Sequence, residues 1–174
     1  MTDRLPVIVV DDNLAQLAAA VEELEDAGWR VRGIDDLDEA ARELVEHTDP
    51  FVLILDHDFE RRDGRTGLDL TRLLRSAHPW GAVLPICYWS GRIDGTGFLA
   101  ALRDGQMFAP SSYVQKGSVE VVEVAGLADE AFRRFRDTFE QQALRRAVLD
   151  LDVSIPVEDE LDELTVHPAD EEGR

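Results

Sequence analysis

The sequence predicts an α/β fold in which helices cover both faces of a parallel β-sheet. Three apolar runs, at residues 5–10, 51–55 and 84–89, are short and end at polar residues. Runs of this kind are typical of strands that are buried on both faces. Apolar residues between the runs recur at the spacing of helices that pack against a sheet. The alternation of strand and helix favours right-handed parallel crossovers and therefore a three-layer sandwich.

The order of the remaining elements specifies the fold further. Residues 29–34 alternate like an edge strand, and residues 112–116 predict a short fifth strand. Helices are expected after the cap Asn13, from Asp36 or Asp38 until before Pro50, from about Leu68 to Ala77 and, more weakly, from about Gly97 to Arg103. Five parallel strands with about five helices predict a flavodoxin-like sheet.

The pattern changes after the fifth strand. Residues 119–124 fit either a strand or the start of a helix, and the sequence leaves both open. A long helix is expected from Asp129 to about Leu149, with Phe132, Phe135 and Phe139 forming an apolar stripe that packs on the sheet. As an alternative, Leu144, Val148 and Leu149 at its far end form a docking surface or a homodimer contact. We expect one domain over residues 1–149.

Residues 150–174 are expected to form an acidic, partly mobile tail. They contain ten acidic residues and one arginine, a composition that favours mobility. The whole chain has a net charge of −19, which argues against nucleic acid and anionic membranes as partners. Cys87 is the only cysteine, so no intrachain disulfide can form. No signal peptide or membrane span is evident, and we expect a soluble, cytoplasmic protein.

The candidate site residues directly follow or end the predicted strands. Asp11 and Asp12 follow the first strand, Asp56 follows the central strand, Ser90 follows the fourth, and Lys116 ends the fifth. In open α/β sheets, ligands bind outside the carboxyl ends of the strands. We therefore expect three carboxylates, a hydroxyl and an ammonium group to share one edge of the sheet.

Three carboxylates at one edge require a cation. Like charges ~4 Å apart repel by about 4 kcal/mol at a partly screened protein surface. A few carboxylate oxygens on an open edge suit Mg²⁺ better than Ca²⁺. A phosphoryl group on Asp56 would then lie between the metal and Lys116, with Ser90 and the backbone N–H groups after the strand as donors. Asp56 is thus a candidate nucleophile that forms an aspartyl-phosphate.

In this order and spacing, the residues resemble the response-regulator receiver domain of bacterial two-component signalling, over about residues 4–149. The matching pieces are Asp11-Asp12, Asp56, Ser90-Gly91, and Tyr113 three residues before Lys116. The resemblance implies that Asp56 accepts a phosphoryl group from a histidine kinase or a phosphotransfer protein and that Lys116 binds it. It also implies the following metal ligands: Asp12 and Asp56 directly, Asp11 through water, and Asp58 through its carbonyl oxygen. Ser90 and Tyr113 would form the switch pair.

The chain departs from the family pattern at three places. Gly117 stands where the family usually has a proline, and the loop at residues 60–67 is longer than usual and lacks its proline. Asp58 adds a fourth carboxylate, with which Arg92 is a candidate ion pair. We expect these departures to change the lifetime of the phosphate rather than phosphorylation itself. His57 is expected to point to the opposite face of the strand, away from the site.

Two other functions stay open. Asp56 and Asp58 also resemble the DxD motif of haloacid-dehalogenase-type phosphatases, although that family needs a further acidic motif after the lysine. A degenerate receiver that acts only as a binding module is the other alternative. As a receiver, the chain would be no enzyme beyond its own phosphotransfer and dephosphorylation. It would signal to an unknown protein target, with residues 93–105 and Tyr113 as the switch face. The last helix and the tail would either bind the target or cover that face until phosphorylation.

Overall fold

The computed structural model describes residues 4–59, 64–91, 111–117 and 121–152. Five parallel strands form one sheet in the order β2-β1-β3-β4-β5. The strands are β1 (Val7–Val10), β2 (Val31–Ile34), β3 (Val52–Leu55), β4 (Ile86–Ser90) and β5 (Ser111–Gln115). This order places β1 and β3, the two strands that aspartates follow, side by side within the sheet. The predicted flavodoxin-like α/β fold is confirmed.

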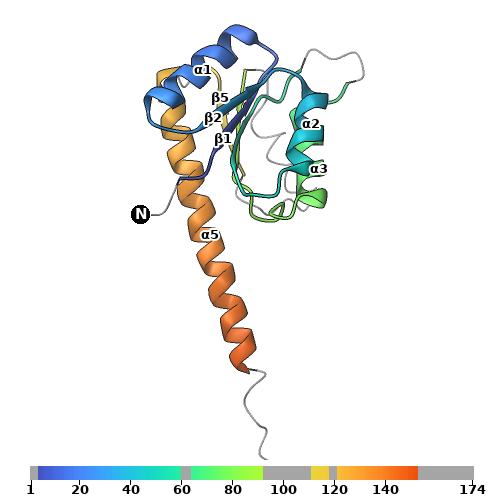
Figure 1. The fold of residues 1–174 in the computed structure, drawn as a ribbon, viewed down its shortest axis with the longest axis vertical. Coiled ribbons are helices and arrows are strands. Elements are labelled where there is room, and N and C mark those ends of the chain that lie inside the picture. Colours follow the sequence, from blue (N-terminus) through green and yellow to red (C-terminus); the bar gives the residue numbers. More distant parts are fainter. Residues whose placement is uncertain (1–3, 60–63, 92–110, 118–120, 153–174) are drawn as a thin grey trace, which may run out of the picture. The chain divides into compact units, whose positions relative to one another are not determined.

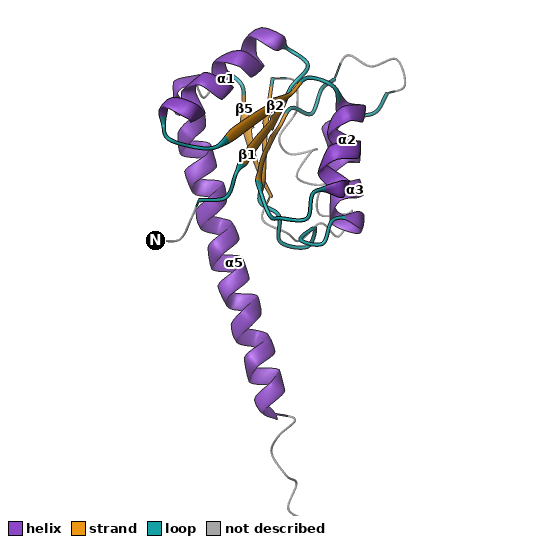
Figure 2. Cartoon of the chain, in the orientation of Figure 1, coloured by secondary structure: helices purple, strands orange, loops and turns teal. Residues whose placement is uncertain are grey.

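Helices cover both faces of the sheet, as Figures 1 and 2 show. They are α1 (Leu14–Asp26), α2 (Leu37–Glu46), α3 (Gly67–Ala77) and α5 (Val124–Asp152). α1 and the first part of α5 lie on one face, and α2 and α3 lie on the other (Figure 1). The helix expected near residues 97–103 lies outside the described residues.

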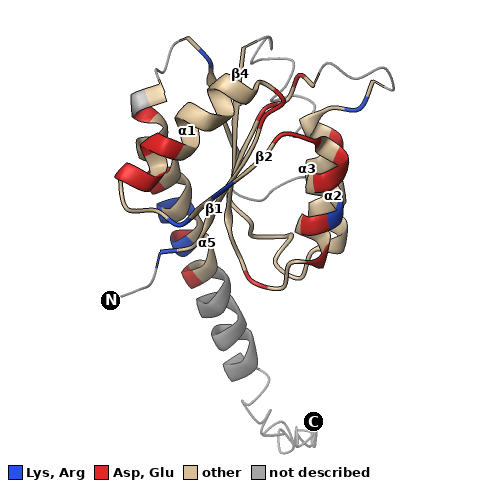
Figure 3. Cartoon of the chain, turned by 45° about the horizontal axis from the view of Figure 1, so that its top comes forward, with Lys and Arg blue, Asp and Glu red and all other residues tan. Residues whose placement is uncertain are grey.

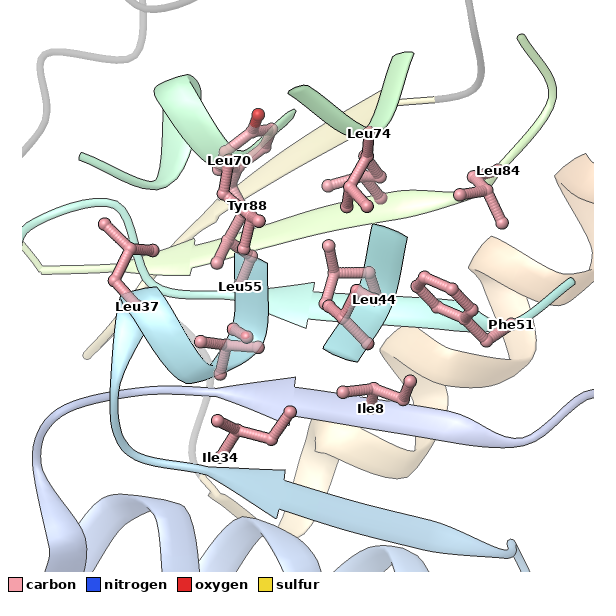
Figure 4. Close-up of a cluster of buried hydrophobic side chains, with 14 of the residues drawn as sticks. Ile8, Ile34, Leu37, Leu44, Phe51, Leu55, Leu70, Leu74, Leu84 and Tyr88 are labelled. Carbon is pink, nitrogen blue, oxygen red and sulfur yellow. The ribbon is translucent and has the colours of Figure 1, made fainter. Parts of the chain in front are cut away.

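Each face of the sheet has its own apolar core, because successive side chains of a strand point to opposite faces. Under α2 and α3, for example, Ile8, Leu55 and Tyr88 belong to one buried cluster (Figure 4). On the other face, Val9, Ile54 and Trp89 pack with residues of α1 and α5. The short apolar runs of the sequence are therefore strands buried on both sides, as predicted.

Local signals fix where the helices begin. The Asn13 side chain accepts a hydrogen bond from the Gln16 N–H at 3.2 Å and so caps α1. Asp36, and not Asp38, caps α2, because its carboxylate accepts hydrogen bonds from the N–H groups of Asp38 and Glu39. Thr66 and Asp69 form a capping box at the start of α3.

The last helix begins earlier than the expected Asp129. A short 3₁₀ turn spans Val121–Glu123, and α5 then starts at Val124, so the described part of residues 119–124 is helical rather than extended. Val124 and Ala128 are fully buried on the sheet, and this packing outweighs the weak helix propensity of Gly126. Phe135 is buried, whereas Phe139 is 43% exposed. The side chains of Leu144, Val148 and Leu149 lie outside the description.

The chain divides into two compact units, residues 1–141 and 142–174. The first unit contains the sheet and every site residue discussed below. Most of the expected acidic tail, at residues 150–174, lies outside the described residues. Within the part of the chain that is described, no helix is long and apolar enough to cross a membrane. Figure 3 shows acidic residues on α1 and α2.

Candidate functional site

Three aspartates converge at the carboxyl ends of β1 and β3. Asp11, Asp12 and Asp56 each place one carboxylate oxygen within 4.8 Å of the other two. Asp11 is 1% exposed and Asp56 is 8% exposed, while Asp12 is half-buried. The convergence follows from the pairing of Val10 with Leu55, which aligns the ends of the two strands. The sequence prediction that these three residues share one edge of the sheet is correct.

Lys116 joins two of these carboxylates. Its ammonium nitrogen Nζ lies 2.7 Å from Asp11 Oδ2 and 2.8 Å from Asp56 Oδ2. The backbone N–H of Lys116 donates to the carbonyl oxygen of Ser90 at 2.9 Å, which continues the ladder between β4 and β5. Because the lysine follows a strand that is two places from β3 in the sheet, its long side chain reaches back across the end of β4.

Asp11 is held from two sides. Its Oδ1 accepts a hydrogen bond from the Asn13 N–H at 2.9 Å, and its Oδ2 accepts one from Lys116. Burial raises the pKa of Asp11 above its ordinary value, while the bonds to Lys116 and Asn13 oppose that rise. The neighbouring Asp56 carboxylate contributes to the rise as well. The lysine therefore opposes the protonation of Asp11 that burial favours.

Asp56 is oriented by the backbone that follows it. Its Oδ1 accepts hydrogen bonds from the N–H groups of His57 at 2.7 Å and Asp58 at 3.3 Å. In the structure these N–H groups donate to the aspartate itself, and their donation to a bound phosphoryl group stays a prediction. The tight turn after β3 brings both donors back to the carboxylate. Asp56 Oδ2 is the oxygen that pairs with Lys116.

A pocket of about 410 Å³ opens over these residues. The residues that line it are Asp12, Asn13, Gln16, Asp56, Asp58, Ser90, Gly91 and Lys116. Asp11 is absent from this lining, and it lies behind the pocket in contact with Lys116. Asp58, for which the resemblance implies a role of the carbonyl oxygen, is one of the lining residues. Sequence reasoning missed Gln16, which lies three residues after the cap Asn13 and reaches the same pocket.

The two residues of the expected switch pair are close to one another. Ser90 is fully buried, and its hydroxyl Oγ has no hydrogen-bond partner among the described residues. The Tyr113 hydroxyl donates to the Ser90 carbonyl oxygen at 3.5 Å. A buried hydroxyl without a partner is uncommon, since leaving it unsatisfied costs about 1–3 kcal/mol. Ser90 is also one of the residues that line the pocket.

Other residues of the sequence prediction fall outside the pocket or outside the description. His57 is half-buried, does not line the pocket and has its pKa lowered chiefly by burial. Arg92, residues 93–105 and residues 60–63 of the loop at residues 60–67 lie outside the described residues. The peptide bond before Gly117 is trans, and Gly117 has a φ of 89°. The turn after β5 is thus made by a left-handed glycine.

The donor set suits a hard divalent cation. Asp11, Asp12 and Asp56 supply oxygen ligands only, and their mutual repulsion is incompletely offset by the single ammonium group of Lys116. Carboxylate oxygens on an open pocket with room for water are the surroundings that Mg²⁺ prefers. The residues present therefore fit the Mg²⁺ that the sequence predicted.

The fold has many relatives of known structure, although no family model matches the chain and a search of the curated proteins gives no match. A structure described as an adenylate cyclase from Rhodopirellula baltica has a TM-score of 0.65 at 18% identity. The alignment covers 83% of this chain and 98% of the chain of that structure. The receiver domain protein (CheY-like) from Methanospirillum hungatei JF-1 has a TM-score of 0.60 at 19% identity, with coverages of 78% and 99%.

A third structure with a similar fold is the signal receiver domain of a modulated diguanylate cyclase from Desulfovibrio desulfuricans G20. It has a TM-score of 0.58 at 21% identity, and the alignment covers 77% of this chain and 98% of the receiver-domain chain. At these identities the likeness concerns the fold. The chain therefore has the fold of response-regulator receiver domains, and it gathers an acidic cluster and a lysine at the carboxyl edge of that fold's sheet.

Proposed function

We propose that the chain is a receiver that accepts a phosphoryl group on Asp56 in a Mg²⁺-dependent reaction. The donor is a phosphohistidine of a histidine kinase or a phosphotransfer protein. The observation that carries the proposal is the position of Lys116 Nζ, within 2.8 Å of Asp56 Oδ2, beside three converging carboxylates. This combination supplies one nucleophile, one fixed cation and ligands for a second cation within a single pocket.

Phosphoryl transfer requires mainly positioning and electrostatic stabilisation, and the residues around Asp56 offer both. A carboxylate oxygen of Asp56 forms the new bond to phosphorus, while the bond from phosphorus to the imidazole nitrogen breaks and its electron pair stays with the imidazole. The His57 and Asp58 N–H groups hold the carboxylate in place before the donor arrives. Lys116 neutralises charge on the phosphoryl oxygens.

Asp12 and Asp56 would hold Mg²⁺ directly, with Asp11 behind them, and the ion would neutralise the remaining phosphoryl charge. Ser90 has a buried hydroxyl that can donate to a phosphoryl oxygen once one is present. That new hydrogen bond favours one arrangement of the segment around Ser90 and Tyr113. The output is then a protein contact that phosphorylation creates or removes.

The proposal is tested by incubating the full chain with acetyl phosphate and Mg²⁺ and measuring its intact mass. We expect one phosphoryl adduct, which is lost when EDTA replaces Mg²⁺ and in Asp56→Asn. Asp69→Asn serves as the control, because Asp69 belongs to the α3 capping box and not to the pocket. Absence of an adduct with acetyl phosphate and with phosphoramidate would contradict the proposal and favour a pure binding module.

The phosphatase alternative has one observation in its favour, since Asp58 lines the pocket together with Asp56. That family needs an acidic motif at a strand end after the lysine. In the described residues that follow Lys116, the chain forms a 3₁₀ turn and α5, and no strand. Steady hydrolysis of p-nitrophenyl phosphate that Asp58→Asn abolishes would establish the phosphatase and overturn the receiver.

A further inference from the structure

The ammonium group of Lys116 has a third neighbour besides the two carboxylates. Its Nζ lies 5.3 Å from the centroid of the Trp89 ring, over the ring face. Lys116 is the only lysine among the 174 residues, and its side chain is 12% exposed. A cation within about 6 Å of an indole face is attracted by the ring quadrupole, and the attraction is stronger where water is excluded.

Trp89 is itself fixed by packing rather than by hydrogen bonds. The residue is 3% exposed, and its indole Nε1 has no hydrogen-bond partner among the described residues. The ring belongs to the buried cluster that contains Val124, Ala128 and Ala131 of α5. One side chain thus contacts both the site lysine and the cluster in which α5 packs on the sheet. Trp89 also directly precedes Ser90, which is one of the residues that line the pocket.

We propose that Trp89 is a positioning residue for Lys116 and connects the position of the lysine to α5. The ring face and the carboxylates of Asp11 and Asp56 together hold the ammonium group at the pocket. The proposal rests on the proposed function, because the lysine binds the incoming phosphoryl group. When the ammonium moves to the phosphoryl oxygens, its contact with the ring changes. Since the ring is close-packed, residues of α5 must adjust.

The first test uses the fact that the chain has one lysine. In protein labelled with [ε-¹³C]lysine, the Cε group gives a single NMR signal, and the Trp89 ring current should shift its protons upfield. Trp89→Leu should remove the shift, whereas Trp89→Phe, which keeps an aromatic face, should retain part of it. Trp29→Leu is the matched control, because Trp29 is buried in the same cluster but carries Arg4 over its ring. The Trp29→Leu variant should leave the chemical shift of the lysine Cε protons unchanged.

The second test measures the rate of phosphorylation by acetyl phosphate. We expect Trp89→Leu to lower the rate roughly three- to tenfold, the range that loss of a partly desolvated cation–π contact implies. Trp89→Phe should recover most of the rate. Beryllium fluoride with Mg²⁺ serves as a phosphoryl mimic. On its addition, the amide NMR signals of Val124 and Ala128 should shift in the wild type and in Trp89→Phe, whereas they should not shift in Trp89→Leu.

The proposal is overturned if the lysine signal of Trp89→Leu matches the wild type, or if the phenylalanine variant loses as much rate as the leucine variant. It is also overturned if the α5 signals respond equally in all variants. Failure of the proposed function would look different. In that case no variant would form an adduct, while the ring-current shift of the lysine would still report whether Trp89 positions it.

Discussion

Replacement of Lys116 by methionine should expose the electrostatic cost of the acidic cluster. The ammonium group contacts Asp11 Oδ2 and Asp56 Oδ2, and both carboxylates are more than nine-tenths buried. With the cation removed, carboxylate oxygens within 4.8 Å of one another repel by about 3.5 kcal/mol at an effective dielectric constant of about 20. Removing one partner of a buried ion pair typically costs about 3–5 kcal/mol. We expect Lys116→Met to lower the free energy of unfolding by about that amount near neutral pH.

The loss should depend on pH in a defined direction. Burial raises the pKa of Asp11 already in the wild type, and Lys116 opposes the rise, so the variant should have an even higher Asp11 pKa. A carboxyl group with a raised folded-state pKa binds its proton more tightly when folded. Stability therefore falls as the pH rises from the unfolded value of 3.8 through the folded value. The difference between variant and wild type should thus be larger at about pH 7 than at about pH 5.

Urea unfolding at the two pH values, with and without Mg²⁺, measures both effects. Mg²⁺ should stabilise Lys116→Met more than the wild type, because the variant presents the same carboxylates without a competing cation. Arg72→Met is the control: Arg72 pairs with Asp69 at 3.2 Å, and its side chain is 54% exposed. Loss of this exposed ion pair should lower the free energy of unfolding by less than about 1 kcal/mol. If Lys116→Met is as stable as the control and insensitive to Mg²⁺, the electrostatic reasoning is refuted.

Three further predictions concern single residues near the sheet. Gly67→Ala should destabilise the fold and slow phosphorylation, because a Cβ at this position would collide with the Asp56 carbonyl oxygen. Gly126→Ala is the control: a Cβ there meets open space, so urea unfolding should show unchanged or higher stability. Ser90→Ala should leave the free energy of unfolding unchanged or slightly raised, because it removes a buried hydroxyl that has no hydrogen-bond partner among the described residues. The same variant should abolish the α5 response to beryllium fluoride, and a response equal to that of the wild type would exclude Ser90 from the switch. The Cys87 thiol should react with Ellman's reagent only when the protein unfolds, because burial excludes the reagent and raises the pKa of the thiol. Fast reaction of the native protein would contradict the packing of β4.

The sheet could be predicted from sequence because its signals are local. The runs around Val9, Ile54 and Cys87 are apolar without interruption, and strands buried on two faces require that. The aspartates after β1 and β3 could be placed at one edge because parallel strands end on the same side. The start of α5 could not be placed in this way. Val124 is helical because it packs on the sheet, whereas Gly126 weakens the local helix signal.

Apart from Gln16, the charged residues and the serine that line the pocket could be predicted, but their contacts could not. The sequence indicated that Lys116 belongs near Asp56, yet the pairing with Asp11 depends on the relative placement of β5, β4 and β1. Trp89 stands in an apolar run and is typical of a core residue, which it also is. Its contact with the ammonium group arises because the lysine side chain crosses the end of β4. The donors to Asp56 Oδ1 follow from the turn geometry, which the loop sequence alone does not specify.

The central claim is that the acidic cluster and Lys116 allow one particular side chain, Asp56, to carry a phosphoryl group. The most direct measurement is chemical mapping of the adduct. After incubation with acetyl phosphate and Mg²⁺, borohydride reduces an acyl phosphate to the alcohol, which tandem mass spectrometry locates in the sequence. We expect homoserine at position 56 alone, and none without Mg²⁺. Labelling at Asp11, Asp12 or Asp58 instead, or no labelling at any aspartate, would contradict the account.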